Sequence, residues 1–402
     1  MPSQTESNEH GGGVAIKIST GPKVYSLTSP PSEPEPKPPK ELLAKAMSYA
    51  DRTILVTVPF PDSVELIGDV MNHHLHSPDD SGKSAKAKYK ELDEETRSWV
   101  EGFKKGESFS QYLQKSTTGP KAYAIFRLPY DPVQPLNRAH LHLFRTPGTD
   151  YGAWTVKLSF SAIKAGADGL VKLISGADDP LGNINLLKML PDMRVSRIDA
   201  AVDLIGANPL DLIAHVAKPG KRMVYVGNSG SPESLYLYER KKPLTGPPKS
   251  FSYKTLGPLR MKIYERRDYH RQLLLQPPYG DCPVTRIEIE RRWKQKKQRP
   301  FLANIGTLPN FFQGRRVAYA PTVAASESSA YQAQWIQFCM AAFGAGVWPA
   351  QSRWNVGQGL SMRKRHDDCQ GNLIDDSCWS GWLAGIDVSG LGKWVTIANL
   401  EN

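Results

Sequence analysis

Two short segments of the chain combine an arginine with regularly spaced acids: Arg197-Ile-Asp-Ala-Ala-Val-Asp203 and Arg286-Ile-Glu-Ile-Glu290. Alternate side chains of a β-strand share a face, so each segment is predicted to have one apolar face and one face carrying its arginine and acids. If the two strands pair, four carboxylates come together: Asp199, Asp203, Glu288 and Glu290. Such an oxygen-rich group suits Mg²⁺ or Mn²⁺, and the two arginines are placed to hold phosphate.

A tyrosine lies between these segments, in Met261-Lys-Ile-Tyr264-Glu-Arg-Arg267. An unassisted phenol, with a pKa near 10, is a poor nucleophile at neutral pH. Lys262 is predicted on the same strand face, where its charge would stabilise a developing phenolate. A tyrosine, a divalent metal site and basic residues together are what an enzyme needs to cut DNA through a phosphotyrosine. A similar motif, Leu235-Tyr-Leu-Tyr238-Glu-Arg-Lys241, makes Tyr238 the alternative nucleophile.

The order of these segments resembles the trans-type rolling-circle replication initiation proteins of plasmids and filamentous phages. That family has an Arg-(Ile/Leu)-Asp-x-(Ala/Cys)-x-Asp strand, a Tyr-x-Gly-Ser turn with a second serine, an Ile-Tyr-(Asp/Glu)-Lys strand and an Arg-(Ile/Val/Trp)-Glu strand. This chain has, in the same order, Arg197 to Asp203, Tyr225-Val-Gly227-Asn-Ser-Gly-Ser231, Ile263-Tyr-Glu-Arg266 and Arg286 to Glu290. The resemblance covers roughly residues 150 to 300. Arg266 stands where the family usually has lysine, which keeps the charge and changes the donor geometry.

The resemblance implies a DNA nicking and joining endonuclease that starts rolling-circle replication at a hairpin or single-stranded origin. Tyr264, whose spacing to the last strand is closer to the family's than that of Tyr238, would attack a metal-polarised phosphate. The products would be a 5′-phosphotyrosine link and a free 3′-hydroxyl for a host polymerase. No Walker motif occurs in the sequence, so a host helicase would unwind the DNA. A homodimer is also implied by the resemblance.

Further candidate ligands lie in Ala139-His140-Leu-His142-Leu-Phe144. Two histidines two residues apart on a strand share a face and can bind one ion together. This matches the His-hydrophobic-His signature of the wider nickase superfamily, in which both imidazoles bind the catalytic metal. The alternative is that both histidines contact phosphate or a partner from a hairpin. The residues expected to contact DNA are six arginines: Arg197, Arg266, Arg267, Arg286, Arg291 and Arg292.

The composition narrows the class of protein. The chain has 402 residues and a formal net charge of +11, which favours a polyanionic partner such as DNA. The four cysteines lack paired short spacings, so neither a disulfide scaffold nor a zinc ribbon is expected. No basic-then-apolar leader and no apolar run of about twenty residues is present, so a soluble cytoplasmic protein without membrane contact is expected.

The elements that must position these residues are predicted to form an α+β fold, an antiparallel sheet with helices packed on one face. Runs of β-branched and aromatic residues predict strands at 53–58, 121–128, 140–144 and 154–163. Helices are expected at 41–50, from Pro61 toward His76, within 165–190, at 209–217 and at 326–343.

Three regions follow from the composition: a disordered tail rich in proline and glycine (1–40), the nickase domain (41–310), and a smaller tryptophan-rich C-terminal domain or extension (311–402). Tryptophans at this density indicate core packing, and the alternative is a platform on which DNA bases stack.

Two other functions fit the same residues. The first is a non-catalytic basic DNA-binding protein in which the acidic strands only stabilise the sheet. The second is a metal-dependent nuclease that uses water and leaves no protein on the DNA. Cleavage that depends on a divalent metal excludes the first, and a covalent adduct excludes the second.

Overall fold

The computed structural model describes residues 15–18, 42–49, 52–69, 122–129, 138–145, 154–178, 186–209, 212–216, 219–226, 232–240, 256–266, 282–319 and 371–400, with positions 84, 87, 90 and 94. The chain divides into two compact units, each assembled from separated stretches. The first unit comprises Met1–Pro59, Ala201–Arg291 and Asn310–Gly381, and the second comprises Phe60–Ala200, Arg292–Pro309 and Trp382–Asn402.

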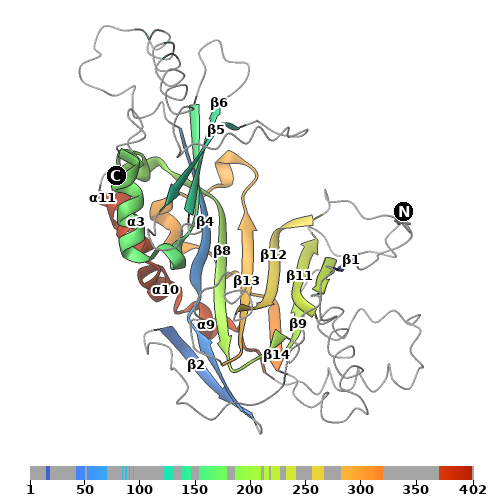
Figure 1. The fold of residues 1–402 in the computed structure, drawn as a ribbon. Helices are drawn as coiled ribbons and strands as arrows, with labels where there is room; N and C mark the ends of the chain where they lie inside the picture. Colours follow the sequence, from blue (N-terminus) through green and yellow to red (C-terminus); the bar gives the residue numbers. More distant parts are fainter. Residues whose placement is uncertain are drawn as a thin grey trace, which may run out of the picture. The chain divides into compact units, whose positions relative to one another are not determined.

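The first unit is built on a sheet of long antiparallel strands (Figure 1). From one edge its strands are β1 (Ala15–Ile18), β10 (Pro219–Val226), β11 (Pro232–Arg240), β12 (Leu256–Glu265), β13 (Val284–Arg292) and the end of β8 (Arg194–Ile205). Strand β1 pairs in parallel with β10, and the other pairs from β10 to β13 are antiparallel. Beyond β8 follow β3 (Thr53–Thr57) and β2 (Leu43–Ser48), also antiparallel.

Strict alternation gives this sheet two different faces. One face is apolar and buried, with Leu235, Leu237, Met261, Ile263, Ile287 and Ile289. The residues between them are tyrosines, acids and bases, so the whole polar set shares the opposite face. A separate two-stranded sheet in this unit pairs β9 (Leu212–Val216) with β14 (Arg315–Tyr319).

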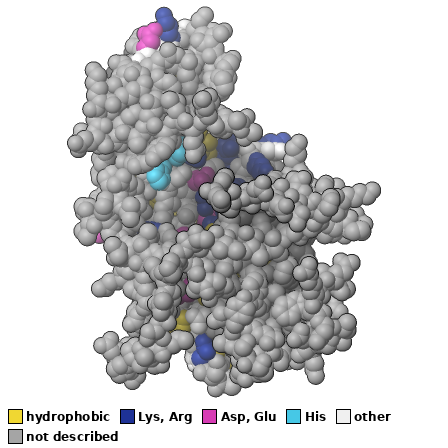
Figure 2. Space-filling model, turned by 45° about the vertical axis from the view of Figure 1, so that its right-hand side comes forward, with side chains coloured by type: hydrophobic (Ala, Val, Ile, Leu, Met, Phe, Trp, Pro, Cys, Tyr) yellow, Lys and Arg dark blue, Asp and Glu magenta, His cyan; other side chains and the backbone are white. Residues whose placement is uncertain are grey.

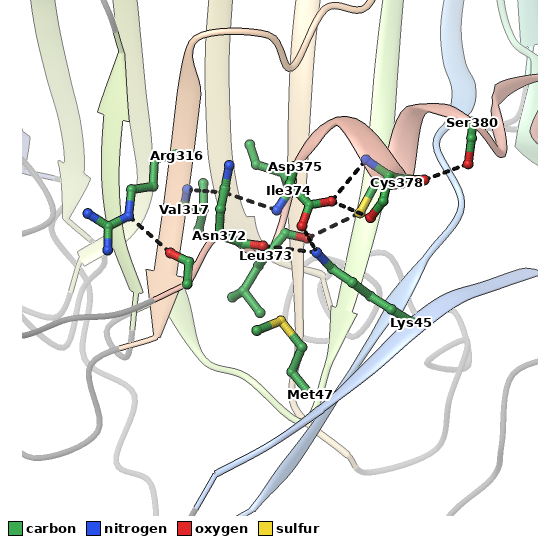
Figure 3. A network of polar contacts seen from close by, with 12 residues as sticks. Lys45, Met47, Arg316, Val317, Asn372, Leu373, Ile374, Asp375, Cys378 and Ser380 are labelled. Atoms are coloured by element: carbon green, nitrogen blue, oxygen red, sulfur yellow. Dashed lines mark hydrogen bonds and ion pairs between the residues drawn. The ribbon is translucent and has the colours of Figure 1, made fainter.

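A polar network ties the last part of the first unit to β2 (Figure 3). Lys45 Nζ donates to the carbonyl of Asn372 at 2.9 Å and to Asp375 Oδ2 at 2.7 Å. Asp375 also caps the short helix α9 (Asp376–Trp379) by accepting from the backbone N–H of Ser377 at 3.1 Å. The side chain of Asn372 accepts from the N–H of Val317 in β14 at 3.0 Å. The network therefore connects three stretches that are far apart in sequence.

The second unit places helices against one face of a second antiparallel group of strands. Its strand order is the beginning of β8, then β4 (Phe60–Asp69), β7 (Trp154–Ser161), β6 (Arg138–Arg145) and β5 (Ala122–Pro129). Helices α3 (Ala162–Asp178), α10 (Trp382–Val388) and α11 (Leu391–Leu400) lie together beside β4 (Figure 1). Shorter helical turns are α4 (Leu186–Met189), η3 (Leu190–Asp192), η6 (Lys296–Gln298) and η7 (Leu302–Thr307).

The core of the second unit includes two tryptophans from the end of the chain. Trp394 of α11 is 1% exposed, and its ring centroid lies 5.2 Å from that of Phe160 in β7. Trp382 of α10 is also buried, and its indole N–H donates to the carbonyl of Ile305 in η7 at 2.9 Å. These two tryptophans are packing residues.

The predicted α+β class is confirmed, and the four predicted strands correspond to β3, β5, β6 and β7. Helical structure within 165–190 is also present, as α3 and α4. Three predicted helices are wrong: 41–50 contains β2, the stretch after Pro61 is β4, and 209–217 contains β9. In each case pairing with a neighbouring strand outweighs the helix-favouring local sequence.

Strand β1 lies within the predicted tail 1–40, and residues 311–402 contribute to both units. The predicted helix 326–343 lies outside the described residues. Within the described part of the chain, no helix has the length and apolar character needed to cross a membrane.

Candidate active site on the polar sheet faces

The register of β11, β12 and β13 arranges the polar face of the first unit in cross-strand rows. One row is Tyr236, Lys262 and Glu288; the rows on either side are Ser234, Tyr264 and Arg286, and Tyr238, Arg260 and Glu290. Residues directly opposite in an antiparallel pair stand on the same face close enough to interact. Basic and acidic side chains lie next to one another on the face shown in Figure 2.

Tyr264 is hydrogen-bonded to a carboxylate. Its hydroxyl donates to Glu288 Oε1, and Lys262 Nζ donates to the other oxygen, Oε2, at 2.8 Å. Glu288 is 4% exposed, whereas Tyr264 is only partly buried. A tyrosine, a carboxylate that contacts its hydroxyl and a cation that orients the carboxylate make up the arrangement expected of an activated nucleophile.

Tyr238 has a different partner. Arg260 Nη1 donates to the Tyr238 hydroxyl at 3.2 Å, and Arg260 Nη2 donates to Glu290. Burial alone would lower the pKa of Arg260, but the hydrogen bond to Tyr238 and the charge of Glu290 raise it above the ordinary value. Lys262 Nζ lies 3.7 Å from Glu290 Oε2, so the polar contacts continue from Tyr238 to Tyr264. The two tyrosines thus lie at the ends of one network.

Asp203 of β8 is held by two arginines. It is completely buried and accepts from Arg286 Nε at 2.7 Å, from Arg286 Nη2 at 2.9 Å and from Arg266 Nη1. Its backbone N–H donates to Thr57 Oγ1 at 2.9 Å. Arg286 is 2% exposed, so its guanidinium is committed to this buried pair.

Asp199 lies in the second unit and is also paired with an arginine. Arg197 donates two hydrogen bonds to Asp199, from Nε to Oδ1 at 2.8 Å and from Nη2 to Oδ2 at 2.5 Å. Arg197 Nη1 lies 3.5 Å from Oε1 of Glu65 in β4. Glu65 is opposite Ser159 in β7, which is opposite His140 in β6, so these residues share the polar face of this unit.

The two histidines of β6 lie side by side on that face. Their ring centroids are 6.4 Å apart, and His142 stacks on Phe144 with an interplanar angle of 7°. Burial, followed by the charges of Lys157 and His140, lowers the pKa of His142 to about 4. The imidazole of His142 is therefore neutral at pH 7, the form that binds metals.

The predicted metal ligands do not form a ready metal site in the described residues. All four carboxylates accept hydrogen bonds from arginine, lysine or tyrosine side chains. No group of three or more His, Cys, Asp or Glu side chains suited to an ion occurs in the part of the chain that the structure describes. Binding of Mg²⁺ or Mn²⁺ by Asp199, Asp203, Glu288, Glu290, His140 or His142 stays a prediction.

The arginines predicted to contact DNA differ in exposure. Arg266 and Arg286 are buried against Asp203, and Arg267 lies outside the described residues. Arg291 packs over the ring of Phe311 at 5.8 Å, and burial, followed by the charge of Arg315, lowers its pKa. Arg292 is exposed, as are Lys294, Lys296 and Lys297. We call Arg292–Gln298 the basic loop.

The basic loop is anchored at both ends. The N–H of Trp293 donates to the carbonyl of Ser196 at 2.9 Å, and Arg194 Nη1 donates to the carbonyl of Arg299 at 3.1 Å. Trp293 itself is buried. The four exposed cations of the loop are therefore presented by a fixed backbone.

Sequence reasoning missed three residues of these clusters. Glu65 was hidden because its strand was predicted as a helix, and Thr57 because a buried threonine gives no pattern. Arg260 could have been found, since it shares the alternation of Lys262 and Tyr264 along β12. A scan of protein-family models and a search of curated proteins return no match for this chain.

Proposed function

We propose that the protein is a DNA nicking and joining enzyme that initiates rolling-circle replication of a plasmid or phage in the cytoplasm. Tyr264 attacks a phosphodiester of the origin strand, and the 3′-oxygen leaves, so the DNA becomes joined to the protein through a 5′-phosphotyrosine. The energy of the broken bond is kept in the new one, which lets the 3′-hydroxyl reverse the reaction without ATP. A host helicase and polymerase would extend the free end.

The observation that carries this proposal is the hydrogen bond from the Tyr264 hydroxyl to Glu288. It favours Tyr264 over Tyr238, because the hydroxyl of Tyr238 accepts a hydrogen bond from Arg260. A carboxylate partner can remove the phenolic proton, whereas a guanidinium cannot. The exposed cations of the basic loop support a polyanionic substrate.

The test uses labelled single-stranded oligonucleotides that cover the replicon carrying the gene, with Mn²⁺ or with EDTA. A protein–DNA adduct that resists denaturation is expected in the wild type and in Tyr238→Phe, and it is expected to be missing in Tyr264→Phe. If the adduct is lost only in Tyr238→Phe, the nucleophile is Tyr238.

Two outcomes would replace the proposal. Metal-dependent cutting without an adduct would indicate a nuclease that uses water, and binding without cutting would indicate a DNA-binding protein. Comparison of the Mn²⁺ and EDTA reactions also tests the predicted metal requirement.

A further inference from the structure

The two oxygens of Glu288 have different partners, and this difference suggests a role other than metal ligation. Oε1 accepts from the nucleophile candidate Tyr264, and Oε2 accepts from Lys262 at 2.8 Å. The carboxylate is buried, and these two contacts come from the adjacent strand β12. Its orientation is therefore fixed with one oxygen directed at the phenolic proton.

We propose that Glu288 is the general base that takes the proton from Tyr264, and that Lys262 is the positioning residue that holds it. This inference rests on the proposed function. In the forward step the proton moves from Tyr264 Oη to Glu288 Oε1 as the Oη–P bond forms and the P–O3′ bond breaks. The leaving 3′-oxygen takes a proton from solvent. In the joining step the 3′-hydroxyl gives its proton to solvent as it attacks phosphorus, the Oη–P bond breaks, and the tyrosine oxygen recovers the proton from Glu288.

The chemistry requires such a base. At pH 7 only about 0.1% of an ordinary tyrosine is ionised, because its pKa is near 10. General bases placed in hydrogen-bond contact accelerate proton-coupled attack by roughly 10²- to 10⁴-fold. Lys262 contributes a second effect, since its hydrogen bond to Oε2 orients Glu288 before the reaction.

Glu239 provides a matched control on the neighbouring strand β11. Its side chain is also buried, and its carboxylate is paired with a cation, Arg315 in β14, at 2.6 Å. Glu239 alternates with Tyr236 and Tyr238 along β11 and therefore lies away from the face that carries Tyr264, so removal of its charge should leave proton transfer intact. Comparison of the two glutamates thus separates a base from a buried acid of the sheet.

The experiment measures the single-turnover rate of adduct formation from pH 6 to 10 for wild type, Glu288→Gln and Glu239→Gln. We expect Glu288→Gln to be slower by roughly 10²- to 10⁴-fold at pH 7 and to recover tenfold per pH unit as the phenolate forms in solution. Glu239→Gln should follow the wild-type profile. A higher Mn²⁺ concentration should not restore the rate of adduct formation by Glu288→Gln, because the missing group is a base.

Two results would overturn the inference while leaving the proposed function in place. The first is that the wild type forms the adduct and Glu288→Gln forms it at an unchanged rate. The second is that added Mn²⁺, and not a higher pH, restores the rate of Glu288→Gln. If the variant does not fold, the wild-type profile decides: a rate that rises tenfold per unit between pH 7 and 9 excludes an internal base. Absence of any wild-type adduct would instead reject the proposed function itself.

Discussion

Among the single residues, each buried carboxylate is held in place by the cationic side chains that it contacts. Asp203 is the clearest case, because it lies between Arg286 and Arg266 and has no exposed surface. A buried carboxylate that neutralises two guanidinium groups cannot be replaced by a neutral side chain without leaving charge uncompensated. This residue therefore tests stability more directly than catalysis.

Asp203→Asn is expected to lower the free energy of unfolding by about 3–5 kcal/mol, because two buried arginines lose their counter-charge. Urea denaturation followed by circular dichroism measures the change. Asp168→Asn, on the exposed side of α3, removes the same charge and should change stability by less than about 0.5 kcal/mol. Equal effects of the two substitutions would contradict this account of Asp203.

The lowered pKa of His142 predicts a pH dependence of stability. Its pKa is about 4 in the folded protein and near 6.5 in an unfolded chain, so the unfolded state binds the proton first as the pH falls. This contribution is complete above about pH 6.5 and is lost progressively between pH 6.5 and 4. In EDTA, the melting temperature of the wild type should drop more from pH 7 to pH 5 than that of His142→Gln, and parallel drops would contradict the prediction.

At the scale of elements, the basic loop is the part of the molecule best suited to hold a DNA backbone. Substitution of Lys294, Lys296 and Lys297 by alanine is expected to weaken binding of single-stranded DNA. The slope of log affinity against log salt should shrink by about 2, because each lost phosphate contact contributes about 0.7. At saturating DNA the rate of adduct formation should be unchanged.

A control for the basic loop removes three exposed lysines from separate places, Lys90, Lys188 and Lys393. This control changes the net charge by the same amount as the basic-loop variant. The slope of log affinity against log salt should nevertheless stay close to that of the wild type. If both triple variants behave alike, the attraction comes from the net charge of the whole chain.

The network around Asp375 predicts a graded loss of stability. Burial would raise the pKa of Asp375, but the hydrogen bonds from Lys45 and Ser377 and the charge of Lys45 lower it. Asp375→Asn keeps the helix cap and loses the ion pair, which is worth about 0–1 kcal/mol at a partly exposed site. Asp375→Ala also loses the cap, at an additional cost of about 1 kcal/mol. The urea midpoint is expected to be highest for the wild type, lower for Asp375→Asn and lowest for Asp375→Ala.

How far the sequence predicts these elements depends on where their partners lie. Strands such as β7 were predictable because alternating burial is visible in a single segment. Strand β9 was not, because its partner β14 lies about a hundred residues further along the chain. The shared face of Tyr264 and Lys262 followed from alternation, but their contacts with Glu288 depend on a register that one sequence does not contain.

At the scale of the whole molecule, the end of the chain completes a core that begins near residue 60. Trp394 is buried against Phe160 of β7, and its indole nitrogen makes no hydrogen bond in the described structure. Trp394→Ala should cost about 3–5 kcal/mol because of the cavity that it leaves. Trp394→Phe should cost much less, since it keeps a ring and removes a buried donor without a partner. Denaturation of both variants checks this difference.

The alternating faces of β12 and β13 also have an evolutionary consequence. Inserting or deleting a single residue within either strand would move Tyr264 or Glu288 to the apolar face and bring Ile263 or Ile289 to the polar one. Relatives of this chain should therefore keep both strands constant in length and vary in length between residues 266 and 283.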